Sequence, residues 1–200
     1  MGEITFPSDN DFEIPTLDIQ KQAPGVIGKF RIWGKQARKR PYCGDTFSFY
    51  GNDSSFTALI KHPEGIPKSQ AAVIVEPNFS TNDQMAWVDG LHKIYLKRKL
   101  ACYAQIHDQL VIVDLTVSPK FQEANLIGVP RGWKSYCCRA TKQYGPDFLM
   151  DNYTLAQEHA RSTQIIYIVY GGGKATTDYV RGNHWIHIPE YMQTVMEEGS

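Results

Sequence analysis

Residues 71–80 read Ala-Ala-Val-Ile-Val-Glu-Pro-Asn-Phe-Ser, and residues 109–118 read Gln-Leu-Val-Ile-Val-Asp-Leu-Thr-Val-Ser. In both stretches a run of mostly β-branched residues ends at a carboxylate, Glu76 or Asp114, and small or polar residues follow. An apolar run without alternation is typical of a strand buried on both faces, as in parallel sheets covered by helices. The two stretches therefore predict an α/β fold.

The rest of the chain supports the same prediction. Residues 83–105 carry apolar side chains at helical spacing behind a Thr-x-x-Gln capping box, so a long helix is expected between the two strands. Further strands are expected at 135–140 and 164–170, with a helix at 147–160 between them. We predict a mostly parallel sheet, open or closed into a partial barrel, built from βαβ units.

Length and composition suit one compact domain, because 42% of the 200 residues are hydrophobic. We expect an acidic extended arm at 1–28, a single α/β domain at 29–190 and a polar tail at 191–200. Equal numbers of acidic and basic residues, 21 each, give no global charge bias. The sequence shows no secretory leader, no membrane-length apolar run and no CxxC pair, so we expect a cytoplasmic, non-membrane protein with reduced, buried thiols.

The ends of the predicted strands supply a candidate site, since ligands of parallel α/β folds bind beyond the carboxyl ends of the strands. The candidate catalytic residues are Glu76, Asp114, Lys142 and Lys174. The candidate ligand-binding residues are Asn78, Ser80, Asp83, Thr116 and Arg139. The two carboxylates could hold a divalent cation or divide acid and base roles. Alternatively, each acid caps a helix or pairs with a nearby cation, namely Arg139, Lys142 or Lys174.

A glycine-rich turn, Gly171-Gly172-Gly173-Lys174, follows the predicted strand at 164–170. Glycine lets backbone amides face an anion and lysine adds charge, so the turn could bind phosphate. The Walker spacing fails, because residue 168 is Ile and residue 175 is Ala. A flexible connection between strand and helix is the alternative.

A basic and aromatic segment at 29–42 is the second candidate site. Cations beside aromatic rings suit phosphates and stacked bases, which favours nucleic-acid binding. The residues that would make these contacts are Lys29, Arg31, Trp33, Lys35, Arg38, Lys39 and Arg40. The alternatives are a solvated basic face or a segment that docks on the acidic arm.

The order of several motifs resembles a known family. These are Trp-Gly-Lys-Gln-Ala-Arg at 33–38, Glu-Pro-Asn-Phe-Ser at 76–80, Gly-Val-Pro-Arg-Gly at 128–132 and a strand ending in Tyr170-Gly171. Together they are similar to domain of unknown function family 4417, found in bacteria, plasmids and phages. The resemblance spans about Trp33 to Gly171, but the family's paired acids in the phenylalanine-rich segment are replaced here by Ser48, Asn52 and Asp53. It implies an α/β unit and a mobile-element setting, and it implies no mechanism.

The leading functional hypothesis is a phage or mobile-element protein that binds nucleic acid or a nucleotide-like ligand. The alternatives are a metal-assisted phosphodiesterase or nuclease that uses the strand-end carboxylates, and an interaction protein that titrates a host factor. The sequence leaves the metal, the oligomeric state and the presence of catalysis open.

Overall fold

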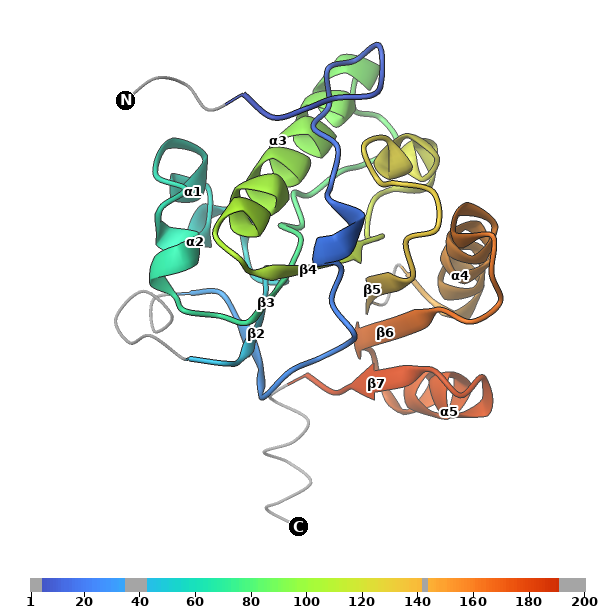
Figure 1. The fold of residues 1–200 in the computed structure, drawn as a ribbon. Helices are drawn as coiled ribbons and strands as arrows, with labels where there is room; N and C mark the ends of the chain where they lie inside the picture. Colours follow the sequence, from blue (N-terminus) through green and yellow to red (C-terminus); the bar gives the residue numbers. More distant parts are fainter. Residues whose placement is uncertain (1–4, 35–42, 142–143, 191–200) are drawn as a thin grey trace.

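The computed structural model describes residues 5–34, 43–141 and 144–190. Its centre is a sheet of seven parallel strands that follow one another in sequence order. The sheet curls into a nearly closed barrel (Figure 1), which confirms the predicted α/β class and parallel sheet. The strands are β1 (Phe30–Ile32), β2 (Thr46–Ser48), β3 (Val73–Val75), β4 (Leu110–Asp114), β5 (Ser135–Ala140), β6 (Ile166–Gly171) and β7 (Ile186–Ile188).

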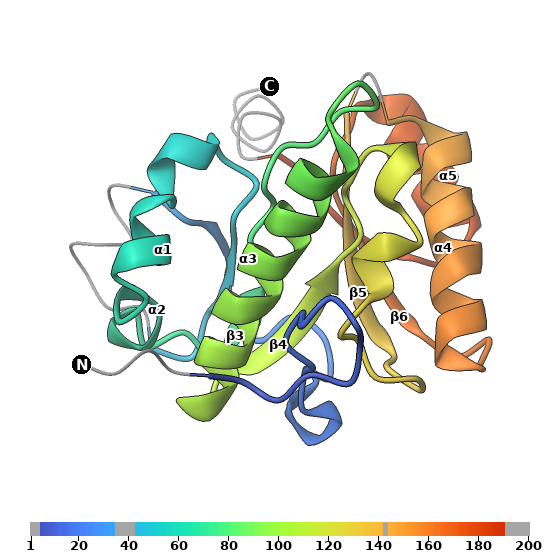
Figure 2. The ribbon, with the colours of Figure 1, turned by 90° about the horizontal axis from the view of Figure 1, so that it is seen from above.

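Helices form an outer layer around the strands (Figure 2). The α-helices are α1 (Ala58–Lys61), α2 (Gly65–Lys68), α3 (Trp87–Ile106), α4 (Pro146–Ala160) and α5 (Lys174–Gly182). The 3-10 turns are η1 (Ile19–Lys21), η2 (Asp53–Ser55), η3 (Pro119–Phe121) and η4 (Ala124–Leu126). The crossover from β4 to β5 thus contains only two short turns, whereas those on either side of it contain the long helices α3 and α4. Among the described residues, no helix is both long and apolar enough to span a membrane.

Alternation along the strands assigns side chains to the barrel interior or to the helical layer. Val73, Val75 and Ile112 belong to an interior cluster, while Ile74 and Val113 pack in the outer cluster under the helices. Continuing this alternation, Glu76 falls on the helix-facing side and Asp114 on the interior side. The two side chains therefore leave neighbouring strands in opposite directions, although Lys97 Nζ of α3 lies 3.9 Å from Glu76 Oε2 and 3.1 Å from Asp114 Oδ2.

Residues 5–28 contain the 3-10 turn η1 and no α-helix or named strand, and they pack closely against the barrel. The Ala23 amide donates to the Val111 carbonyl at 2.9 Å, so this segment joins the amino end of β4. Five residues earlier in the segment, Asp18 contacts α3. The Gln105 side chain accepts from the Asp18 amide and donates to the Asp18 carbonyl, both at 2.9 Å. With Ile14, Leu17 and Ala23 buried, the segment forms part of the core.

The long helix begins later than the sequence predicts, at Trp87 rather than near residue 83. The reason is that the expected capping residue is used elsewhere. The Thr81 hydroxyl accepts a hydrogen bond from the Ser118 amide at 2.8 Å, which ties the loop after β3 to the loop after β4. The Asn82 side chain then accepts from the Gln84 amide and forms a turn ahead of the helix.

Candidate functional site at the carboxyl ends of the strands

Glu76 forms a closed ion pair between β3 and α3. Its carboxylate is fully buried and accepts from Arg98 Nη1 and from the Asp114 amide, the latter at 3.2 Å. The Arg98 guanidinium also donates from Nη2 to the Asn125 carbonyl at 2.7 Å and from Nε to the Ile127 carbonyl at 3.2 Å. Every nitrogen of this buried guanidinium has a partner, so the pair links sheet, helix and η4.

Asp114 accepts four hydrogen bonds. Tyr50 Oη at 2.9 Å and the Thr116 amide at 3.1 Å donate to Oδ1, while Asn78 Nδ2 at 3.0 Å and Lys97 Nζ at 3.1 Å donate to Oδ2. A carboxylate offers about four lone-pair positions, so all of them are filled. Burial, followed by the charge of Asp114, raises the pKa of Tyr50 well above its usual value, which keeps the phenol protonated as the donor.

Four residues of this network were not predicted from the sequence, namely Tyr50, Lys97, Arg98 and Asn125. Lys97 Nζ donates to the Asp114 carbonyl at 2.7 Å, to Asp114 Oδ2, and to Asn125 Oδ1 at 3.0 Å, which uses all three of its donors. The signal was the spacing of Ile94, Arg98 and Ala101, which places a cation on a buried helical stripe. Burial of such a cation requires a partner from the sheet.

These contacts favour the structural interpretation of the two carboxylates. The protein's own cations neutralise both acids, and the acceptor positions that a divalent cation would need on Asp114 are occupied. Within residues 5–34, 43–141 and 144–190, no group of three His, Cys, Asp or Glu side chains could hold a metal ion. Both acids thus form ion pairs, which is the alternative considered from the sequence, but their partners are Lys97 and Arg98. The partners considered from the sequence were Arg139, Lys142 and Lys174.

The remaining predicted site residues do not converge on this pair. The Ser80 hydroxyl donates to Asp53 Oδ1 at 3.0 Å, and the Asp83 carboxylate accepts from the Lys120 amide at 3.2 Å, both in surface loops. Lys174 is exposed at the start of α5. Lys142 lies outside the described residues. Among the described predicted residues, the Asn78 side chain and the Thr116 amide join Glu76 and Asp114 in one hydrogen-bonded network, and Arg139 adds only its backbone amide.

Arg139 differs from Arg98 in how completely it is bonded. It lies at the carboxyl end of β5, and alternation from Cys137 places it on the interior side of the barrel. Its amide donates to Thr116 Oγ1 at 2.7 Å, while its side chain is 32% exposed. Its Nε is buried and has no hydrogen-bond partner in the described part of the chain, and its Nη2 lies 3.6 Å from Glu190 Oε1.

The end of β6 lies beside Arg139, because the strand register pairs Arg139 with Tyr170 and Ala140 with Gly171. The Tyr170 ring stacks between the Phe30 and Tyr50 rings, with centroid distances of 5.6 and 5.2 Å. Burial raises the pKa of Tyr170, the charge of Glu190 raises it further, and Arg139 opposes this, so the three groups share one region.

The glycine turn follows directly after Tyr170. Gly171 and Gly172 both have φ of +80°, a conformation that other residues rarely adopt. Gly173 is the N-cap of α5, and no side chain caps this helix end. The predicted glycine-rich turn is therefore real, and it needs glycine for its backbone conformation.

The basic and aromatic segment is only partly described. The Trp33 side chain is 3% exposed and stacks on Phe49 at 5.2 Å, so its ring belongs to the core and cannot stack on a base. Arg31 Nε is paired with Asp45. Lys29 is exposed. The other predicted contacts, Lys35, Arg38, Lys39 and Arg40, lie outside the described residues.

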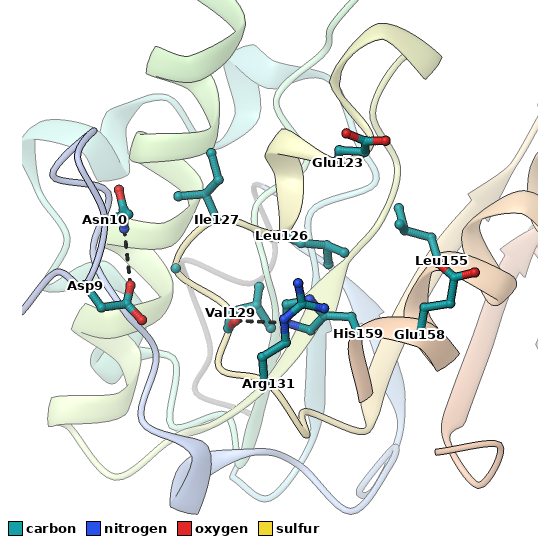
Figure 3. A pocket seen from close by; sticks show the side chains of 11 residues that line it. Asp9, Asn10, Glu123, Leu126, Ile127, Val129, Arg131, Leu155, Glu158 and His159 are labelled. Carbon is teal, nitrogen blue, oxygen red and sulfur yellow. Dashed lines mark hydrogen bonds between the residues drawn. The ribbon is translucent and has the colours of Figure 1, made fainter. Parts of the chain in front are cut away.

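A cavity of about 480 Å³ opens elsewhere, in the helical layer (Figure 3). Asp9 and Asn10 of the N-terminal segment border one side, and Leu155 and Glu158 of α4 border the other. His159 Nε2 donates to the Val129 carbonyl at 2.9 Å, and burial lowers its pKa. The other residues that line the cavity are Glu123, Leu126, Ile127, Gly128 and Arg131. Three carboxylates against one arginine make this cavity unsuitable for a phosphate.

Comparisons with protein-family models, with curated proteins and with solved structures found no match to this chain. The resemblance to domain of unknown function family 4417 therefore stays a prediction.

Proposed function

We propose that this protein binds a phosphate-bearing, nucleotide-like ligand at the carboxyl ends of β5 and β6, with Arg139 as the main anion-binding residue. The observation that carries the proposal is the contrast between two arginines at the same end of the barrel. Arg98 has a partner for every guanidinium nitrogen, whereas Arg139 is partly exposed and has a buried Nε without a partner among the described residues.

An unpaired buried donor is energetically unfavourable. Leaving such a group without a hydrogen bond costs about 1–3 kcal/mol, and more for a charged group. An arginine at a purely structural position is expected to be bonded as Arg98 is. A phosphate would satisfy the donors of Arg139, since the planar guanidinium matches two phosphate oxygens at once.

The glycine turn after β6 supports a phosphate in this region. Gly171 follows Tyr170, the register partner of Arg139, and the uncapped amino end of α5 comes two residues later. Helix amino ends and glycine turns favour anions, because their amides carry partial positive charge. By analogy, eight-stranded βα barrels often bind phosphate in the loops after their last two strands.

A small ligand fits the described residues better than a nucleic-acid strand. Two of the predicted nucleic-acid contacts, Arg31 and Trp33, are engaged within the fold itself, and the whole chain has zero formal charge. Binding of a strand through phosphate contacts needs several cations along one surface. The mobile-element setting remains part of the proposal on the strength of the sequence resemblance alone.

The test is a binding panel by isothermal titration calorimetry, using inorganic phosphate, AMP, ADP, ATP and a single-stranded oligonucleotide. We expect at least one phosphorylated small molecule to bind wild-type protein and to lose its binding in Arg139→Gln. Arg181→Gln is the matched control, because Arg181 lies in the last turn of α5 and is exposed. If no small phosphate compound binds, or if binding survives in Arg139→Gln, the proposal fails.

A further inference from the structure

The Glu190 carboxylate lies beside the Arg139 guanidinium. It follows β7 by two residues, and its Oε1 lies 3.6 Å from Arg139 Nη2. This separation is an ion-pair distance and is longer than a hydrogen bond. The side chains of Arg139 and Glu190 are 32% and 41% exposed, so solvent screens the pair.

The same carboxylate lies against the glycine turn. A Cβ added to Gly171 would come within 3.1 Å of both Cγ and Oε1 of Glu190. Glycine at this position therefore leaves room for an anionic group beside the backbone. The charge of Glu190 also acts on Tyr170, the neighbour of Arg139 in the sheet.

We propose that the Glu190 carboxylate is an internal competitor for the anion site, where it takes the place of the ligand's phosphate on Arg139 and is displaced when that ligand binds. This inference rests on the proposed function and adds how the site selects its ligand. A ligand with a carboxylate would replace the weak Arg139–Glu190 ion pair by a similar one, so its binding would gain little free energy. A phosphate dianion carries more charge and more acceptor oxygens, so it displaces Glu190 more effectively.

The contrast with Glu76 supports a displaceable role. Glu76 is buried and hydrogen-bonded to Arg98, and separating this pair would leave two unpaired charges inside the protein. The Glu190 side chain is only partly buried, has no hydrogen bond to Arg139, and leaves Arg139 Nε without a partner among the described residues. Its departure requires no disruption of the core.

The experiment measures the Kd of ADP and of inorganic phosphate by calorimetry for wild type, Glu190→Gln, Arg139→Gln and the control Glu158→Gln on α4. Glu190→Gln keeps the size of the side chain and removes its charge. We expect it to bind both probes about three- to fivefold more tightly, the range that a weak solvent-screened pair allows. Glu158→Gln should bind as wild type does, and Arg139→Gln should not bind.

The outcomes separate this inference from the proposed function. If wild type binds, Arg139→Gln does not, and Glu190→Gln binds no more tightly than wild type, the competitor role is wrong while the ligand site stands. If Glu190→Gln, with its competitor removed, binds neither probe, or if binding persists without Arg139, both are wrong.

Discussion

Replacement of Glu76 by Ala should destabilise the fold, because it leaves the Arg98 guanidinium buried without its counter-charge. Arg98 is 0% exposed, and only two backbone carbonyls would remain as its acceptors. Removing one partner of a buried ion pair costs about 3–5 kcal/mol. That is a large part of the 5–15 kcal/mol by which proteins of this kind are typically stable.

The assay is urea unfolding followed by tryptophan fluorescence. With a slope of about 2 kcal/mol per molar urea, the loss corresponds to a fall in the unfolding midpoint of about 2 M. Asp108→Asn is the matched control, because its pair with Lys21 lies at the surface and the Asp108 side chain is 90% exposed. We expect the control to unfold at the wild-type midpoint.

A double variant tests whether the pair itself is responsible. Glu76→Leu with Arg98→Met replaces both charges with apolar side chains, and buried pairs replaced in this way often lose little stability. The double variant should therefore be more stable than Glu76→Leu alone. Midpoints within about 0.5 M of wild type for Glu76→Ala and Glu76→Gln would refute the structural role and restore a functional one.

Three further predictions follow from burial. Burial raises the pKa of Cys102 and Cys138 to about 12 and that of Cys137 well above its usual value. At pH 8 the folded protein should therefore show one rapidly alkylated thiol, that of the exposed Cys43, whereas the protein in urea should show four. Rapid alkylation of more than one thiol in the folded protein would contradict this. Burial lowers the pKa of His159, so the unfolded chain binds a proton that the folded chain does not, and the free energy of unfolding should fall as pH drops below about 6.5. His159→Gln should flatten that slope in urea titrations at pH 5 to 7, and an unchanged slope would exclude His159 as its source. Trp33→Ala should cost about 3–5 kcal/mol in thermal or urea unfolding, and loss of oligonucleotide binding at unchanged stability would instead support the nucleic-acid hypothesis.

The position of each site residue along its strand could be read from the sequence, but its bonding partners could not. Glu76 and Asp114 were correctly placed at strand ends, because an apolar run that stops at a carboxylate marks the point where a buried strand leaves the core. Their opposite orientation depends on which residue of each strand starts the alternation, and this is fixed by pairing between strands far apart in sequence.

The same limit applies to the basic residues. From the sequence, Arg31, Arg139 and Lys174 are candidate nucleic-acid-binding, ligand-binding and catalytic residues, and Lys97 and Arg98 are not singled out. Only the tertiary structure shows that Lys97 and Arg98 are neutralised inside the protein, while Arg139 keeps one donor without a partner among the described residues. The burial of Trp33 is likewise a result of packing against Phe47 of β2 and against Phe49, which follows that strand.

The sequence by itself determined the α/β class, the parallel strands and the glycine turn after β6, because hydrophobic periodicity and backbone freedom are local properties of the chain. The tertiary structure alone decided which carboxylates are paired with buried cations and which buried arginine nitrogen has no partner among the described residues. Those assignments depend on burial and on partners supplied by distant segments, as Asn125 and Ile127 are for Arg98 and Glu190 is for Arg139. The role of a charged residue at a strand end thus depends on the segments that pack against it.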